Sequence, residues 1–216
     1  MNKKKLLFIV NVDWFFLSHR LPIAIEAINQ GYEVHIATTI SNELDSLKKN
    51  GLIVHPINLN RSRTGLLSVI SEFKEILDII RLIAPNIVHL VTIKPVLLGG
   101  MASRLLNVPS VVYAVSGLGY VFLKKGAMAL IMRKIIIYFY QLAFRHKNKC
   151  VIFQNDNDQS TLTKLSLLSS NEVELINGSG VDLSLFTQQP FNSGVPIIIL
   201  AARLLKDKGV KEFVEA

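Results

Sequence analysis

The feature that most constrains the fold is a regular alternation of short apolar runs with amphipathic, helix-type patterns. The apolar runs have the length of β-strands, and many of their residues are β-branched. They span residues 5–10, 33–39, 53–59, 87–93, 110–115, 150–154 and 172–176. Strands that are almost wholly apolar are buried on both faces, and their alternation with helices predicts a parallel sheet with right-handed crossovers. We therefore predict an α/β fold with a doubly wound, mostly parallel sheet.

The segments between these runs carry apolar residues at a spacing close to that of an α-helix. Ser18 is placed to cap the first of them, and Gly31 follows its last turn. The predicted helices cover residues 18–31, 43–50, 65–84, 95–106 and 156–168, and one more lies between residues 120 and 150. No internal repeat interrupts this series.

Ligands of such a sheet bind beyond the carboxyl ends of its strands, so the loops after the strands are the informative ones. His19 and Arg20 follow the first strand at a helix start, where they could hold an anionic substrate. Gly117 and Gly119 follow the fifth strand and would let a ligand approach the backbone. The alternative is that these are surface and turn residues. No GxGxxG pattern follows the first strand, which argues against a nicotinamide or flavin site.

Other residues with chemical potential have simpler interpretations. His89 and His35 lie inside apolar strands, so we expect both to be satisfied core residues. Cys150 is the only cysteine and allows no internal disulfide or cysteine metal cluster, which suits a reducing compartment. We expect it to pack in the core.

The amino-terminus does not have the pattern of an export signal. Lysines at 3–5 precede the apolar residues 6–10, but Asn11 and Asp13 interrupt the run and no small-residue cleavage site follows. No stretch reaches 18 uninterrupted apolar residues, so a conventional membrane span is not predicted.

The positive charge is concentrated in one apolar segment. Residues 120–150 contain seven Lys or Arg and no acidic residue, which accounts for +7 of the net charge of +8. The segment predicts a long apolar helix with a basic stripe near Lys134, Gln141 and Arg145. Such a helix can lie in the headgroup region of an anionic membrane. It can also be a buried helix whose basic ends reach water, and both interpretations stay open. Nucleic acid is not an expected partner, because no exposed aromatics are interleaved with the charges.

The end of the chain has the pattern of a phosphate clamp. An apolar, β-branched run at 196–200 predicts a strand, Arg203 and Lys208 lie in the loop after it, and Gly209 opens a helix with Val210. Arg offers a planar fork and Lys a point charge to a diphosphate, and helix N–H groups favour an anion. A solvated loop with ordinary surface charges is the alternative.

Six segments, taken in order, resemble retaining glycosyltransferases of family 4, which have the GT-B fold of two Rossmann-like domains facing each other across a cleft. They are residues 16–22 (FLSHRLP), 89–95 (HLVTIKP), 115–122 (VSGLGYVF), 153–155 (FQN), 177–183 (NGSGVDL) with Phe186, and 202–209 (ARLLKDKG). The likeness is greatest to bacterial enzymes that add an N-acetylhexosamine to a sugar on undecaprenyl diphosphate during cell-surface glycan assembly.

The resemblance implies a role for each half of the protein. The amino-terminal domain would bind the acceptor and the carboxyl-terminal domain a nucleotide sugar, commonly a UDP-sugar. Arg203 and Lys208 match the basic residues that hold the donor diphosphate and stabilise charge on the departing nucleotide, with Gly209 beside them and no metal or other cofactor required. The residues expected to face the acceptor are His19, Arg20, Lys94, Gly117, Gly119 and Tyr120, with Arg20 and Lys94 as partners of its diphosphate.

A lipid-linked acceptor would give the basic helix a purpose. We therefore expect the protein to be cytoplasmic and to associate peripherally with the anionic inner face of the bacterial plasma membrane. The expected membrane contacts are Lys124, Lys125, Arg133, Lys134 and Arg145.

Two departures from the family pattern matter. Some members carry a histidine after the fifth strand, where this chain has Val115 and Ser116, so no catalytic base is assigned. The family's Glu-x7-Glu pair belongs beyond residue 216, and Glu212 and Glu215 do not match it. We expect a fragment without transferase activity of its own. Its predicted parts are an acceptor domain at 1–186, a linker at 187–195 and the start of a donor domain at 196–216.

Other functions stay open at this point. A UDP-sugar epimerase would share the architecture without using a lipid acceptor. A non-catalytic domain that docks on a membrane or a partner chain is the other alternative. In that case the apolar segment from Pro196 onward could associate through an unpaired edge.

Overall fold

The computed structural model describes residues 3–59, 65–118, 122, 126–166, 168–184, 186–188, 190, 194–202, 204–205 and 208–216, with only the backbone of Ser166. The chain separates into two compact units, Met1–Gly180 and Val181–Ala216. The predicted acceptor domain ran to residue 186, and the observed first unit ends at Gly180. Each unit is described by itself.

The first unit contains a seven-stranded sheet in which every pairing is parallel. Its strand order is β3-β2-β1-β4-β5-β6-β7. The strands are β1 (Lys5–Val12), β2 (Glu33–Thr39), β3 (Ile53–Pro56), β4 (Ile87–Val91), β5 (Ser110–Val115), β6 (Lys149–Phe153) and β7 (Val173–Leu175). This confirms the predicted α/β fold with a doubly wound, Rossmann-like parallel sheet.

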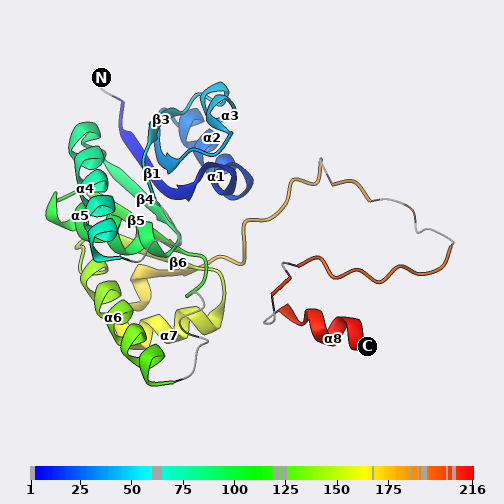
Figure 1. Ribbon diagram of the computed structural model, residues 1–216. Coiled ribbons are helices and arrows are strands. Elements are labelled where there is room, and N and C mark those ends of the chain that lie inside the picture. The colour runs from blue at the N-terminus through cyan, green and yellow to red at the C-terminus, as the bar shows by residue number, and fades with distance from the viewer. Residues whose placement is uncertain are drawn as a thin grey trace. The chain divides into compact units, whose positions relative to one another are not determined.

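Helices connect the strands and cover both faces of the sheet (Figure 1). One side carries α1 (Asp13–His19), α2 (Leu21–Asn29) and α3 (Leu44–Lys49). The other side carries α4 (Leu66–Ile83), α5 (Gly100–Leu105) and α6 (Ala127–Ala143). The remaining helical segments of this unit are the π-helix η1 (Pro95–Gly99), α7 (Asp156–Ser166) and the 3₁₀ turn η3 (Ser170–Glu172).

Alternate residues of each strand enter different cores, because successive side chains of a strand point to opposite faces. Leu7 and Ile9 of β1 pack into the core that includes residues of α4, η1 and α6. Leu6, Phe8 and Val10 pack into the second core, which includes residues of α1, α2 and α3. Both faces of the central strand are thus apolar, as its sequence predicts.

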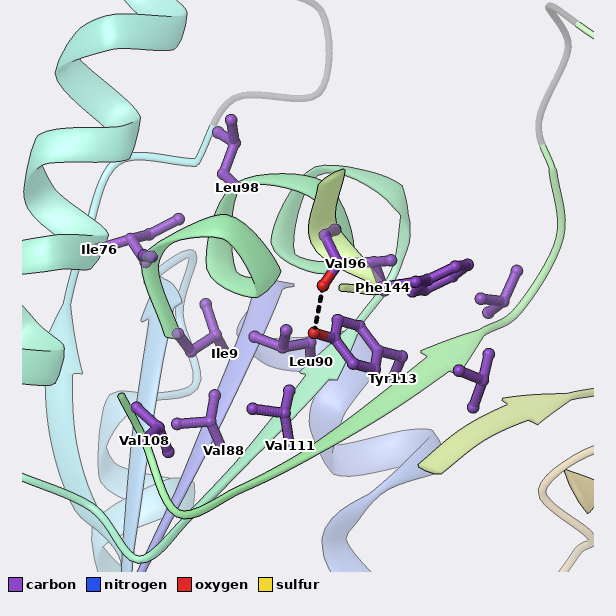
Figure 2. Packing of buried hydrophobic residues seen from close by; sticks show 14 of the residues in the cluster. Ile9, Ile76, Val88, Leu90, Val96, Leu98, Val108, Val111, Tyr113 and Phe144 are labelled. Carbon is purple, nitrogen blue, oxygen red and sulfur yellow. Dashed lines mark hydrogen bonds between the residues drawn. The ribbon is translucent and has the colours of Figure 1, made fainter. Parts of the chain in front are cut away.

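The larger core depends on a close approach of helices around Tyr113 (Figure 2). The buried phenol donates a hydrogen bond to the carbonyl oxygen of Ala143 at 2.6 Å, and its burial raises the pKa of Tyr113. A Cβ on Gly100 would lie 2.7 Å from Cε1 of Tyr113 and 2.8 Å from Cβ of Ala143. Only glycine therefore lets α5 begin so near β5 and α6.

Several predicted details are corrected. Ser18 does not cap a helix, because the chain is already helical at Asp13. Its hydroxyl instead donates to the carbonyl oxygen of Trp14 at 2.9 Å. The third strand ends at Pro56 rather than residue 59, and the helix predicted at 95–106 begins with a π turn.

The second unit is described from Val181 onward, and its regular element is α8 (Val210–Glu215), as predicted after Gly209. The strand predicted at 196–200 is absent from this described segment. A strand needs a neighbour for its backbone hydrogen bonds, and these residues have no ladder partner. Ile197, Ile198 and Ile199 are 76–82% exposed.

Candidate functional site

The site follows from the point at which the strand order reverses. β2 and β3 lie on one side of β1, and β4 to β7 lie on the other. In a doubly wound sheet the ligand crevice lies outside the carboxyl ends of the strands at this reversal. Here that edge has a small pocket of about 180 Å³. Its lining residues are His19, Arg20, Pro22, Ile23, His89, Ala114, Ile152, Gln154, Ile176, Gly178 and Ser179.

Arg20 brings a buried positive charge to this pocket. It joins α1 to α2, and only 6% of the residue is exposed. Nη1 donates to the carbonyl oxygen of His19 and to Oγ of Ser179, both at 3.0 Å, while the buried Nε has no hydrogen-bond partner. No carboxylate among the described residues pairs with this guanidinium, and burial lowers the pKa of Arg20. A buried charge without a counterion is costly, which marks the pocket as a place for an anion.

His89 lies beside this charge on β4. Its ring stacks on Phe8 at a centroid distance of 4.9 Å, and 7% of the residue is exposed. Burial, together with the charge of Arg20, lowers the pKa of His89 to about 3, so the imidazole is neutral near pH 7. His89 is buried, as predicted for a core histidine. The prediction that its hydrogen bonds are satisfied is wrong, because Nε2 is buried without a hydrogen-bond partner.

A second, larger cavity of about 880 Å³ opens at the carboxyl ends of β1 and β2. Its lining is largely polar and includes the indole of Trp14, which is 49% exposed. The neighbouring Asp13 fixes this edge, since its carboxylate accepts hydrogen bonds from the backbone N–H groups of Ser41 at 2.7 Å and Glu43 at 3.1 Å. Burial opposes ionisation of Asp13, but a hydrogen bond from the Ser41 hydroxyl, together with these backbone bonds, outweighs it and lowers the pKa. Polar lining residues are Asn11, Thr39, Asn58, Ser68, Ser71, Glu72 and Glu75.

Lys94 does not reach the small pocket. Its Nζ donates to both carboxylate oxygens of Glu72, at 2.8 and 2.9 Å, and Glu72 lines the larger cavity. The side chains of this pair are 17% and 4% exposed. The role of Lys94 as a diphosphate partner stays a prediction. In the structure its ammonium is paired with Glu72 at the larger cavity, whereas Arg20 lies in the small pocket.

The backbone is strained directly after β4, at Thr92. Thr92 follows β4 with φ +74°, in the left-handed region, which is unfavourable for a β-branched residue. Its hydroxyl is buried without a hydrogen-bond partner. Such conformations cost about 1–3 kcal/mol and cluster at functional sites. Thr92 thus strengthens the assignment of the β4 edge to function.

α6 presents an apolar stripe to solvent. Five of its residues recur at helical spacing on one face and are 40–73% exposed. These are Met128, Ile131, Met132, Ile135 and Tyr138. Lys134 of α6 is exposed, as is Arg145 just beyond the end of the helix, whereas Arg133 donates to the carbonyl oxygen of Phe122 at 2.9 Å. No helix in the described part of the chain is long and apolar enough to cross a membrane.

The structure locates the other predicted site residues only in part. His19 joins Arg20 in the small pocket, and Gly117 follows β5 with φ +144°. Lys208 and Gly209 belong to the second unit, where Gly209 precedes α8 with φ +71°. Gly119, Tyr120, Lys124, Lys125 and Arg203 lie outside the described residues.

Sequence reasoning missed two polar residues of the small pocket, Gln154 and Ser179. Both follow strands, β6 and β7, so the rule that singled out the loops after β1, β4 and β5 would have found them. Within the described ranges, no group of three or more His, Cys, Asp or Glu residues could hold a metal ion.

Comparison with known proteins supplies a family. The model of the glycosyl transferase 4-like family matches residues 5–155. The chain is 24% identical, over 222 aligned positions, to a Campylobacter jejuni enzyme named N,N'-diacetylbacillosaminyl-diphospho-undecaprenol alpha-1,3-N-acetylgalactosaminyltransferase. That alignment covers 93% of this chain and 58% of the relative, so the chain spans little more than half the length of the curated relative it matches.

Solved structures share the fold. A Rickettsia africae glycosyltransferase matches with a TM-score of 0.54 and 16% identity, covering 86% of this chain and 45% of that one. The Anabaena protein HepE, solved with UDP and glucose, matches with a TM-score of 0.58 and 13% identity over 87% of this chain and 47% of its own. A Neisseria meningitidis UDP-GlcNAc 2-epimerase matches with a TM-score of 0.54 and 12% identity, covering 79% of this chain and 45% of that one.

Proposed function

Because the chain belongs to the glycosyl transferase 4-like family, we propose that it provides the acceptor-binding part of a sugar transferase. The sugar is an N-acetylhexosamine, transferred with retention from a UDP-sugar to a glycan on undecaprenyl diphosphate, in the assembly of a cell-surface glycan. The name of the Campylobacter jejuni relative supports the class of sugar and lipid carrier. Since the chain spans 58% of that relative, the proposal assigns acceptor binding, rather than complete transfer, to these 216 residues.

The observation that carries this proposal is the buried guanidinium of Arg20. It lies at the ligand edge of the sheet, it is 6% exposed, and no described carboxylate neutralises it. The natural complement is an anionic group brought by the ligand, and a planar guanidinium matches phosphate oxygens with two parallel hydrogen bonds. A diphosphate-linked acceptor supplies such a group.

The larger cavity suits the glycan of the acceptor. Its volume of about 880 Å³ lies within the usual range of ligand clefts, about 300–1,000 Å³. An exposed indole offers a flat apolar surface to a sugar ring, and hydroxyl, amide and carboxylate groups can bond sugar hydroxyls. Trp14, Asn58 and Glu75 are such groups in this lining.

α6 supports a peripheral position on an anionic membrane surface. Its exposed apolar stripe can enter the headgroup region while Lys134 and Arg145 meet anionic lipids. We place the protein on the cytoplasmic face of the plasma membrane, where a lipid-linked acceptor would lie within reach.

On the donor side, we propose that Arg203 and Lys208 hold the diphosphate of the UDP-sugar and stabilise charge on the leaving nucleotide, without a metal ion. Gly209 would leave room for the phosphates beside the first turn of α8. The support is the resemblance of residues 202–209 to the family motif.

The experiment is a binding measurement on the 216-residue chain with vesicles of phosphatidylethanolamine and phosphatidylglycerol. One set carries undecaprenyl diphosphate linked to a single N-acetylhexosamine, and the matched set carries undecaprenyl monophosphate. The fluorescence of Trp14, the only tryptophan, reports on the larger cavity. We expect binding to be tighter with the diphosphate-linked sugar and Arg20→Gln to remove that preference. Equal binding to both sets would refute an acceptor role.

An epimerase is the competing function, and the shared fold with the Neisseria meningitidis enzyme motivates a direct test. Incubation with UDP-N-acetylglucosamine alone separates the two, because an epimerase converts this substrate without an acceptor. We expect no acceptor-independent conversion by this chain.

A further inference from the structure

Two buried polar groups in the small pocket lack partners. Nε of Arg20 and Nε2 of His89 are both buried without a hydrogen bond, in residues that are 6% and 7% exposed. Leaving such a group unsatisfied costs about 1–3 kcal/mol. Most buried polar groups are bonded, so two exceptions lining one pocket call for a ligand that bonds them.

We propose that this pocket is an oxyanion site for one phosphoryl group, in which Ser179 and the ring of His89 complete the coordination that Arg20 begins. Assigning that group to the acceptor diphosphate rests on the proposed function. The existence of the site does not, because it follows from the pocket itself.

The size and charge of the pocket select a small anion. Its volume of about 180 Å³ is below the range of about 300–1,000 Å³ for clefts that enclose drug-sized ligands. None of its lining residues is acidic, so no carboxylate in this lining offsets the charge of Arg20. A phosphoryl group fits in this pocket while the rest of its molecule lies outside.

Ser179 is already oriented for such a ligand. Its Oγ accepts the hydrogen bond from Nη1 of Arg20 at 3.0 Å, which uses an acceptor position of the hydroxyl and leaves its proton to donate. None of the hydrogen bonds found for the described residues has this hydroxyl as its donor. Ser179 therefore accepts a hydrogen bond from the guanidinium and keeps an O–H that an anion in this pocket can accept.

His89 adds a donor without adding charge. A neutral imidazole has one N–H and one acceptor nitrogen, and a neighbouring anion stabilises the tautomer that donates toward it. Stacking on Phe8 at 4.9 Å fixes the plane of the ring. The arrangement provides a cation, a hydroxyl and an imidazole N–H from three separate segments of the chain.

The test is isothermal titration with inorganic pyrophosphate of the 216-residue chain carrying Arg203→Gln and Lys208→Gln, which remove the basic residues proposed for the donor diphosphate. Loss of one hydrogen bond to a charged group is worth about 1.5–3 kcal/mol, so Ser179→Ala should weaken binding at least tenfold. Arg20→Lys keeps the charge and removes the fork, and a loss of at least tenfold is expected there too. The matched control is Lys48→Gln, which removes an exposed cation of α3 and should leave pyrophosphate binding unchanged.

The role of His89 is tested in the unaltered protein, so a variant that fails to fold cannot obscure it. In ¹⁵N-labelled chain, pyrophosphate should shift the His89 ring nitrogens toward the Nε2–H tautomer. Absence of any ring shift at saturation would remove His89 from the site. Pyrophosphate binding that survives both Arg20→Lys and Ser179→Ala unchanged would overturn the whole assignment.

Competing probes identify the source of the phosphoryl group. Farnesyl diphosphate, as a short lipid diphosphate, should displace pyrophosphate, whereas UDP should not displace it from the first unit. Displacement by UDP alone would overturn the acceptor assignment. If pyrophosphate binds as expected but the lipid-linked sugar does not, the oxyanion site stands and the proposed function fails. The reverse result leaves the function and removes the site.

Discussion

Acid should destabilise this protein through His89. The folded-state pKa of His89 is about 3 and its ordinary value is 6.5, so the unfolded chain takes up a proton first as the pH falls. Stability that is present above about pH 6.5 is therefore lost progressively down to about pH 3. At about 1.4 kcal/mol per pH unit, the loss between about pH 7.5 and about pH 5 is about 2 kcal/mol, and the full shift corresponds to about 5 kcal/mol.

Urea unfolding at both pH values, followed by circular dichroism, measures this loss. His89→Phe keeps a flat ring against Phe8 and has no proton to gain, so its free energy of unfolding should fall by about 2 kcal/mol less than that of the unaltered chain. His19→Gln removes the half-buried histidine of the same pocket and provides the baseline for losing a histidine there. If the His89→Phe protein and the unaltered chain lose the same free energy, burial of a neutral imidazole at this position is refuted.

Three further substitutions test other features by urea unfolding at neutral pH. Glu72→Gln removes the carboxylate that accepts both hydrogen bonds from Lys94 and should lower the free energy of unfolding by about 3 kcal/mol. The control, Asp78→Asn, breaks an exposed pair with Arg81 and should lower it by less than about 1 kcal/mol, so equal losses would contradict the burial argument. Gly100→Ala should cost about 1–3 kcal/mol because its methyl group would overlap Tyr113 and Ala143, and a neutral effect would show that α5 can shift away. Thr92→Gly should stabilise the fold by about 1 kcal/mol by relieving the left-handed strain, while Thr92→Ala keeps that strain; a destabilised glycine variant would mean that the hydroxyl has a structural partner.

Much of the first unit could be predicted because its strands are short, apolar and clearly separated. β5 has the predicted bounds, Ser110–Val115, and β6 and β7 differ from their predictions by one residue at each end or less. The sheet buries both faces of its strands, so the apolar pattern alone specifies them. The predicted helix type was wrong at Pro95–Gly99, which is a π turn, and the predicted helix start was wrong at Ser18, because α1 begins at Asp13. At both places packing and local hydrogen bonds compete with the intrinsic propensity of the residues.

The sequence predicted where on the sheet the candidate site lies, but not which side chains pair with one another there. Arg20 was expected at the ligand edge, and the pocket contains it. Lys94 was expected beside it, but a carboxylate from α4, on the other face of the sheet, holds that ammonium. Such pairings join residues far apart in sequence, so only the folded chain reveals them.

The hydrogen bond between Arg20 and Ser179 joins residues 159 positions apart. By comparison, the hydrogen bond from His146 to the carbonyl oxygen of Val108 closes a loop of 38 positions. The loop closed by Arg20 and Ser179 is about four times as long, which is two doublings of loop length. It therefore costs only about 1.2 kcal/mol more in chain entropy. The constraint it imposes is one of timing. On the ribosome, β1 and its arginine emerge first, and the residue that orients the guanidinium emerges near the end of the same unit. A nascent chain can therefore assemble most of its sheet before this pocket exists, and ligand binding should appear only after Ser179 has left the exit tunnel.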